Sequence, residues 1–191
     1  MLYIFIGCIG FVLFIIYDLN QIHGHKKQLR ALFAIGFVLI IFATIMIIIG
    51  HVGTFPFPFY LRLIFGILAA INLWLLIYSL FFALPFKNTY ISANNRNVCD
   101  RGMYALCRHP GWLWFALFYC FLWLCLGSML MFWAFICFSL LNFLYIYLQD
   151  RYFFPRLFDD YHCYQKTTPF LIPNHNSIKR AISSVRVCRR I

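Results

Sequence analysis

The chain alternates between long apolar runs and short polar segments, and the length of each run predicts an element. A membrane-spanning helix needs about 20 apolar residues. Leu2–Tyr17 carries no charge, Ala31–Gly50 is an uninterrupted apolar run, and Leu61–Leu84 is a third run with Arg62 at its edge. Each run predicts one membrane-spanning helix. Because Leu2–Tyr17 lacks a basic leading segment and a small-residue cleavage site, we expect a retained helix rather than a signal peptide.

The longest apolar run, Gly111–Leu148, contains no charged residue. A single helix of this length would measure about 57 Å, nearly twice the hydrocarbon core of about 30 Å. The run must therefore fold back, and Gly127-Ser128 near its midpoint is the expected turn. This pattern predicts a hairpin of Trp112–Leu126 and Met129–Leu148. The expected fold is an all-α integral membrane protein with five transmembrane helices and a polar C-terminal segment.

Composition excludes the other broad classes. Of the 191 residues 64% are apolar and only 11% are charged, whereas a soluble domain carries about 25% charged residues. The aromatic content of 21% excludes an intrinsically disordered chain. The eight cysteines show neither a disulfide framework nor zinc-ligand spacing, so we expect free thiols and no metal site.

The net charge of +11 is concentrated in a few segments. Three segments hold 15 of the 16 Lys and Arg residues: Asp18–Arg30, Pro85–His109 and the chain after Leu148. Because basic loops remain in the cytoplasm, we expect the N-terminus outside and the C-terminal segment inside. Basic patches also bind nucleic acids, but no nucleic-acid motif accompanies them here, so we expect no nucleic-acid partner.

The chain divides into three regions: helices in 1–87, a polar-bordered hairpin in 88–173, and a basic tail in 174–191. In the tail, four apolar residues recur at helical spacing, opposite Lys and Arg residues. The four are Ile178, Ala181, Ile182 and Val185. This pattern predicts a surface helix on anionic membrane lipid. Pro56 and Pro58 predict that Phe55–Phe59 is an extended aromatic loop at the headgroup level.

Two polar clusters border the predicted hairpin: Arg108-His109-Pro110 before it and Gln149-Asp150-Arg151 after it. A hairpin returns the chain to the same membrane face, so the two clusters become neighbours. Pro110 suits a first helical turn, and Arg108 and His109 beside that helix N-terminus favour an anion. Gln149 and Asp150 offer hydrogen-bond acceptors. We expect a pocket that is positive at one end and negative at the other, which matches a zwitterionic cofactor.

The first cluster lies in a longer motif. Gly102-Met-Tyr104-Ala-Leu-Cys-Arg108-His109-Pro110-Gly-Trp112 resembles the G-x-Y-x-x-x-R-H-P-x-Y signature of the isoprenylcysteine carboxyl methyltransferase family. In that family a second motif follows the last span, with two acids, Y-x-x-Y and P-x-x-I-P. Here Gln149-Asp150 precedes Tyr161-His-Cys-Tyr164 and Pro169-Phe-Leu-Ile172-Pro173. Order and spacing agree over residues 88–173.

This resemblance implies a membrane methyltransferase that uses S-adenosylmethionine, most like protein-S-isoprenylcysteine O-methyltransferase. It implies that the cofactor is held by a set of nine residues: Tyr104, Arg108, His109, Pro110, Trp112, Gln149, Asp150, Tyr161 and Tyr164. The acceptor would be lipophilic or amphiphilic; prenylated cysteine, a phospholipid headgroup, a small thiol and an isoprenoid acid remain open. No catalytic residue is identified.

The chain departs from the family pattern at three positions. Trp112 replaces the usual tyrosine, Gln149 replaces the first acid, and Phe158 stands where glycine is frequent. Loss of the acid at Gln149 keeps open a non-catalytic membrane scaffold of the same fold. An NADPH-dependent membrane reductase of the steroid 5α-reductase type is a further alternative, although it expects a Gly-Glu pair where Leu113-Trp114-Phe115 stands.

Each site residue also has a purely structural interpretation. Arg108 and His109 would serve as interfacial anchors beside a membrane helix. Asp150 would be the first acid after a span, and Tyr161 and Tyr164 would pack as an aromatic pair. The two motifs at matching distance favour the functional interpretation over these.

Overall fold

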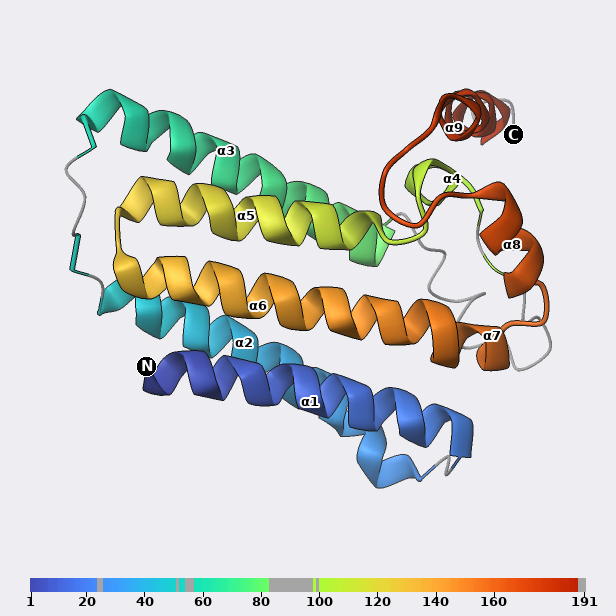
Figure 1. Ribbon diagram of the computed structural model, residues 1–191, viewed down its shortest axis with the longest axis horizontal. Helices are drawn as coiled ribbons and strands as arrows, with labels where there is room; N and C mark the ends of the chain where they lie inside the picture. The colour runs from blue at the N-terminus through green and yellow to red at the C-terminus, as the bar shows by residue number, and fades with distance from the viewer. Residues whose placement is uncertain (24–25, 51, 54–56, 83–97, 99, 189–191) are drawn as a thin grey trace.

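The computed structural model describes residues 1–23, 26–50, 52–53, 57–82, 98 and 100–188, with side chains as far as residue 183. Every regular element in these ranges is helical. The long helices lie along one direction as a bundle, and the short helices gather at one end of it (Figure 1).

The bundle contains five long helices: α1 (Leu2–His23), α2 (Ala31–Ile49), α3 (Phe59–Ile77), α5 (Pro110–Leu126) and α6 (Met129–Leu148). A 3₁₀ turn, Lys27–Arg30, leads into α2, and a π-helical turn, Tyr78–Phe82, extends α3. A second π-helical turn, Gln149–Phe153, joins α6 to α7 (Phe154–Leu157). The remaining short helices are α4 (Met103–Leu106), α8 (Tyr161–Thr167) and α9 (His175–Cys188).

Four of these helical stretches are long and apolar enough to cross a membrane, among the residues that the structure describes. They are Leu2–His23, Lys27–Ile49, Phe59–Phe82 and Met129–Leu157. The fifth predicted span, α5, has 17 residues and is a shorter apolar helix. The expectation of a multi-pass membrane protein therefore agrees with the observed helices.

The predicted hairpin is confirmed. Gly127 ends α5 in the left-handed conformation (φ 61°), and its N–H donates to the Trp123 carbonyl over 2.8 Å. Glycine adopts this conformation without the steric cost that a side chain would add. Helix α6 then spans Met129–Leu148, the range expected from the sequence.

The segment Asp18–Arg30 was predicted as a loop, and this is wrong for most of its length. Helix α1 continues to His23, six residues beyond Tyr17. The polar residues of this extension are stabilised internally: the side chain of Asn20 donates to the Lys26 carbonyl (3.1 Å) and accepts from the Lys26 N–H (3.0 Å). Asn20 therefore closes the turn between α1 and α2.

Helices α1 and α2 approach closely at two glycines. A Cβ on Gly10 would lie 2.7 Å from the Gly36 carbonyl oxygen, and a Cβ on Gly36 would lie 2.7 Å from the Gly10 oxygen. Small residues at such contacts allow membrane helices to pack backbone against backbone. Buried aromatic residues, including Phe11, Tyr119 and Phe138, fill the adjoining core between α1, α5 and α6.

The two ends of the bundle differ in polarity. The α1–α2 turn, the start of α5 and helices α4, α7, α8 and α9 lie at one end, whereas the N-terminus and the α5–α6 turn lie at the other (Figure 1). The described basic segments thus share one end. Of the predicted aromatic loop Phe55–Phe59, residues 55–56 lie outside the described residues, Phe57 and Pro58 have no regular secondary structure, and Phe59 begins α3.

Candidate functional site

The hairpin brings the two polar clusters together as the sequence predicts. Arg108, two residues before α5, donates from Nε to Asp150 Oδ1 (2.7 Å) and from Nη2 to Asp150 Oδ2 (3.0 Å). His109 Nε2 lies 3.5 Å from the same Oδ1. Both partners of the ion pair are nearly inaccessible to solvent, with side-chain exposures of 10% for Arg108 and 2% for Asp150.

Helix α8 completes the surroundings of Asp150. The Tyr161 hydroxyl donates to Oδ1 over 2.6 Å. Gln165 Nε2 donates to the Asp150 carbonyl (2.8 Å) and lies 3.3 Å from Oδ2. Both carboxylate oxygens are therefore satisfied within the chain, as a buried ion pair requires if its desolvation is to be offset.

The donors of Arg108 are likewise occupied. Its Nη1 donates to the carbonyls of Gln165 (3.0 Å) and Thr168 (2.7 Å). The backbone N–H groups of Arg108 and His109 donate to the carbonyls of Pro169 (3.0 Å) and Phe170 (3.3 Å). The segment after α8 thus wraps around Arg108 and fixes it against the end of α6.

Asp150 lies in a π-helical turn that follows α6. Pro155, four residues after Arg151, has no N–H for the Arg151 carbonyl, and its ring crowds that carbonyl in a regular helix. The wider turn Gln149–Phe153 precedes it. Such turns occur frequently at functional sites. Here Asp150 and Phe153 are the buried residues of the turn.

Gln149 does not join Asp150. Consecutive helical residues point about 100° apart, so the two side chains face different neighbours. Gln149 Nε2 donates to Asp18 Oδ2 (3.0 Å) and to the Tyr145 hydroxyl (2.8 Å). The structure therefore separates the predicted Gln149-Asp150 pair into two clusters, one at α8 and one at α1.

Sequence reasoning missed Asp18. Its side chain is buried on α1, where Gln149 is its donor. A signal was present, because Asp18 is the only acid in the first 99 residues and directly follows an apolar run. Gln165 and Thr168 were missed as well. Their backbone carbonyls accept hydrogen bonds from Arg108 because of the path that the backbone takes, and no sequence pattern shows that path.

The aromatic site residues form hydrogen bonds that join neighbouring elements. The Tyr164 hydroxyl donates to the Tyr104 carbonyl (2.6 Å), and the Tyr104 hydroxyl donates to the Ser79 carbonyl (3.0 Å) in the π-helical turn after α3. Trp112 Nε1 donates to the Ser139 carbonyl (3.0 Å), joining α5 to α6. Pro110 occupies the first turn of α5, as predicted.

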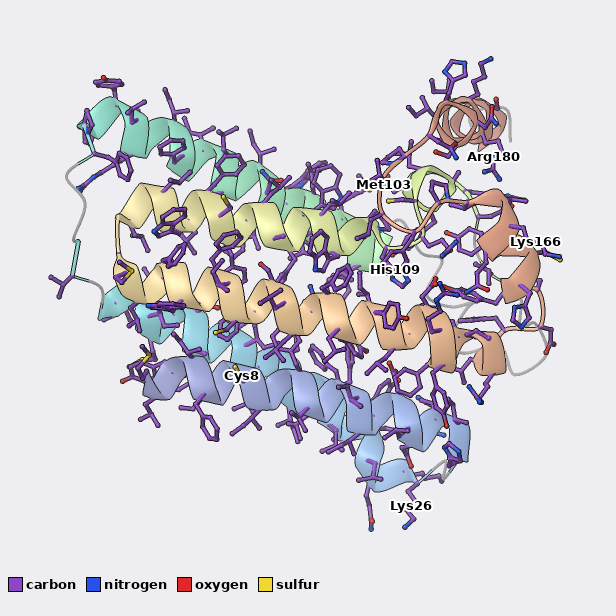
Figure 2. The ribbon with its side chains drawn as sticks, in the orientation of Figure 1. Cys8, Lys26, Met103, His109, Lys166 and Arg180 are labelled. Atoms are coloured by element: carbon purple, nitrogen blue, oxygen red, sulfur yellow. The ribbon has the colours of Figure 1, made fainter. Side chains whose placement is uncertain are left out.

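His109 lies in an aromatic enclosure at the end of the bundle where α5 begins (Figure 2). Its ring is nearly parallel to Phe154 (centroids 5.9 Å apart) and edge-on to Phe170 (5.2 Å). The Arg108 guanidinium lies 5.6 Å from the centre of the Phe170 ring. Within this cluster, His109 Nε2 and Thr168 Oγ1 are buried without a hydrogen-bond partner. The 3.5 Å approach of Nε2 to Asp150 is too long for a good hydrogen bond.

Burial sets the ionisation of this cluster. It lowers the pKa of His109, and the Asp150 carboxylate offsets this only in part, so the imidazole is neutral near pH 7. Burial and the neighbouring Asp150 raise the pKa of Tyr161. Burial raises the pKa of Cys107 to about 11, so this thiol is not a thiolate nucleophile at neutral pH.

The cluster differs from the expected pocket in its charges. Arg108 and Asp150 form a mutual ion pair, so the site is not positive at one end and negative at the other. S-Adenosylmethionine would find no free oxygen on Asp150. It would find the unpartnered His109 Nε2 and the faces of the surrounding rings, which suit hydrogen bonding and contact with a sulfonium. Any contact with this cofactor would therefore come from His109 and the rings, with Asp150 and Arg108 as positioning residues.

Comparisons with protein families, curated proteins and solved structures gave no match to this chain. Within the described part of the chain, no group of three His, Cys, Asp or Glu side chains is placed to hold a metal ion.

Proposed function

We propose that this protein is an integral membrane methyltransferase that uses S-adenosylmethionine and acts on a lipophilic or amphiphilic acceptor. One observation carries the proposal: residues from both motifs meet at a single carboxylate. Asp150 contacts Arg108 and His109 of the first motif and Tyr161 of the second. The hairpin brings the two motifs to one end of the bundle, but it does not by itself require side chains of both motifs to contact the same buried carboxylate.

In this proposal the cofactor supplies a methyl group activated by a positively charged sulfonium. The chain holds and orients it. His109 Nε2 is buried 3.5 Å from Asp150 Oδ1 without a hydrogen bond and is the nitrogen available to the cofactor in this proposal. Phe154 and Phe170 supply aromatic surface, and the Arg108–Asp150 pair holds His109 in place. Methyl transfer is an in-line displacement, so alignment and exclusion of water supply most of the rate enhancement.

The proposed membrane arrangement has five spans, with α5 as the fifth. A helix of 17 residues measures about 26 Å, slightly less than the hydrocarbon core, and α5 packs against both α3 and α6. In this proposal the basic end of the bundle, formed by the α1–α2 turn and α7–α9, lies in the cytoplasm, because basic segments are retained there. The N-terminus is then outside, and the Arg108–Asp150 cluster lies at the cytoplasmic end of the bundle.

The acceptor reaches the site from the bilayer. A prenylated cysteine carboxylate or a small thiol is nucleophilic once ionised, so the chain needs no general base for either. A phospholipid amine must first lose a proton, and the described cluster offers only the neutral His109 for that step. The chemistry of the cluster therefore favours an anionic acceptor atom.

Isothermal titration with S-adenosylhomocysteine tests the proposal. We expect saturable binding to the detergent-solubilised protein, together with a rise in the melting temperature at saturating ligand. The variant His109→Gln should weaken binding at least tenfold, whereas Cys163→Ser, an exposed position on α8, should leave it unchanged. Absence of binding up to millimolar ligand, with the protein shown to be folded, would refute the assignment.

A second candidate, a non-catalytic membrane scaffold of the same fold, is favoured by one observation. Every charged atom of Arg108 and Asp150 already has a partner inside the chain. A scaffold that uses the pair only for stability predicts the same melting temperature with and without S-adenosylhomocysteine. The titration therefore separates the two candidates.

A further inference from the structure

Helix α9 has an orientation unlike that of the bundle. It is seen end-on in Figure 1, where the five long helices lie in the plane of the page, so its axis crosses theirs. It contacts α4, and Arg180 donates a hydrogen bond to the Thr167 carbonyl at the end of α8. If the long helices cross a membrane, α9 runs parallel to the membrane surface at the basic end of the bundle.

The protein covers only part of the apolar side of α9. Ser177 and Ala181 are buried (0% and 6% exposed), whereas Ile178 and Ile182 are 42% and 53% exposed. These isoleucines are four residues apart and so lie on one face, one turn from each other. Ile172, shortly before the helix, is 81% exposed. An isoleucine pair on one helix face is a surface that a partner would cover.

The segment that carries this face is basic and contains no acidic residue. Lys179 is exposed beside the isoleucines, and Lys166 is exposed on neighbouring α8 (Figure 2). Residues 161–191 contain six Lys and Arg and no acid. This balance disfavours a second copy of the same surface as the partner and favours an anionic one.

We propose that the face formed by Ile178 and Ile182 docks on the anionic lipid surface of the membrane that the protein itself crosses. The isoleucines enter the boundary between headgroups and acyl chains, and Lys179 binds lipid phosphates. Three observations agree on this occupant: the axis of α9 across that of the bundle, the uncovered isoleucines, and the basic segment without an acid. The inference is independent of the methyltransferase proposal.

Hydrogen exchange of the full-length protein in nanodiscs tests the docking. We compare discs of phosphatidylcholine alone with discs containing phosphatidylglycerol, and follow the backbone amides of residues 175–183. We expect exchange at least tenfold slower in the anionic discs. Ile178→Asp should abolish that protection. Ser183→Asp adds the same charge on the exposed polar side of the helix and should retain most of it.

Three outcomes would overturn the docking. Equal exchange in both kinds of disc would show that anionic lipid is not the partner. Equal loss of protection in Ile178→Asp and Ser183→Asp would show attraction by charge without insertion of the isoleucines. Protection in phosphatidylcholine discs on adding soluble RNA or an acidic peptide, without such protection by anionic lipid, would assign the face to another partner. Exchange of the α5 and α6 amides reports that each variant is folded.

Discussion

Asp150 is the residue on which the site depends. It accepts hydrogen bonds from Arg108, Tyr161 and Gln165, so one carboxylate ties the start of α5 to α8 and to the end of α6. Replacing a well-paired buried ion pair by apolar groups is often neutral, but removing one partner leaves the other charge buried and uncompensated. Asp150 and Arg108 therefore act as a unit.

Asp150→Asn tests this unit. It leaves the Arg108 guanidinium buried without a counter-charge, so we expect the free energy of unfolding to fall by about 3–5 kcal/mol. Denaturant titration in detergent micelles measures the change. Asp159→Asn is the matched control, because Asp159 is exposed and should change stability by no more than about 0.5 kcal/mol. Equal effects of the two substitutions would contradict a structural role for the pair.

From the family pattern alone, Gln149→Glu would be expected to raise cofactor affinity, because it restores the first acid. The contacts of Gln149 predict a loss of stability. Restoring an acid at this position would remove two donated hydrogen bonds and place a second carboxylate beside Asp18. We expect a loss of about 1–3 kcal/mol in stability instead of a gain in ligand affinity. Adding Asp18→Asn restores a donor–acceptor pair in the opposite sense and should recover most of the loss. A double variant no more stable than Gln149→Glu alone would argue against the contact.

The pH dependence of stability reports His109. Its pKa in the folded state is lowered by burial, so as pH falls below about 6.5 the unfolded chain takes up a proton that the folded chain does not. The stability present above this pH is therefore lost progressively on acidification. His109→Gln should lose less stability than the parent between pH 7.5 and pH 5.5, measured as the difference in melting temperature. A parallel decline in both proteins would contradict a buried neutral imidazole.

At the scale of elements, close contacts between helices set the packing. Helices α1 and α2 meet at Gly10 and Gly36, and α1 meets α6 where a Cβ on Gly7 would lie 2.3 Å from Phe138 Cζ. The first contact is backbone against backbone, so neither helix can yield by rotating a side chain. Glycine is required there for space, whereas at Gly127 it is required for the turn.

Gly36→Ala tests the α1–α2 contact. The added methyl group would lie 2.7 Å from the Gly10 carbonyl and force the helices apart, which we expect to cost about 1–3 kcal/mol. Gly66→Ala on α3 is the control, because its methyl group would meet Cys125 Sγ at 3.4 Å, an ordinary contact. Melting temperatures in detergent compare the two. Similar melting temperatures for the two variants would show that α1 and α2 do not pack in this way.

At the scale of the whole molecule, the described basic segments share one end of the bundle. Lys26 in the α1–α2 turn and Lys166 on α8 are both exposed there, although 140 positions separate them in the sequence (Figure 2). Only an even number of crossings between them allows this, and the proposed spans α2, α3, α5 and α6 satisfy that condition.

We therefore expect Lys26 and Lys166 to lie on the same side of the membrane. In sealed vesicles of one orientation, an impermeant amine reagent should label both lysines or neither, as measured by mass spectrometry. Val52→Lys provides the control, because Val52 is 77% exposed and lies just beyond the end of α2. Its lysine should show the opposite accessibility. Labelling of Lys26 without Lys166 would exclude the five-span arrangement.

The sequence by itself determined the helices, because they depend on local apolar length and on turn chemistry. The uncharged run from Gly111 to Leu148 is too long for one span and contains one Gly-Ser pair, so the hairpin and its turn followed directly. The neighbourhood of Arg108 and Asp150 followed in turn, since a hairpin returns to its starting face. The six extra residues of α1 were not predictable from the sequence. They depend on the two hydrogen bonds between the Asn20 side chain and the Lys26 backbone, which form only once the chain turns toward α2.

Only the tertiary structure decided how the polar groups pair. Adjacent residues on a helix point in different directions, so Gln149 bonds to Asp18 on α1 while Asp150 bonds to Arg108. The sequence predicted a pocket with separated charges, whereas the structure has a closed Arg108–Asp150 ion pair. The carbonyls of Gln165 and Thr168 accept the remaining hydrogen bonds of Arg108. Apolar periodicity depends on neighbours along the chain, whereas pairing of buried charges depends on which elements meet in space.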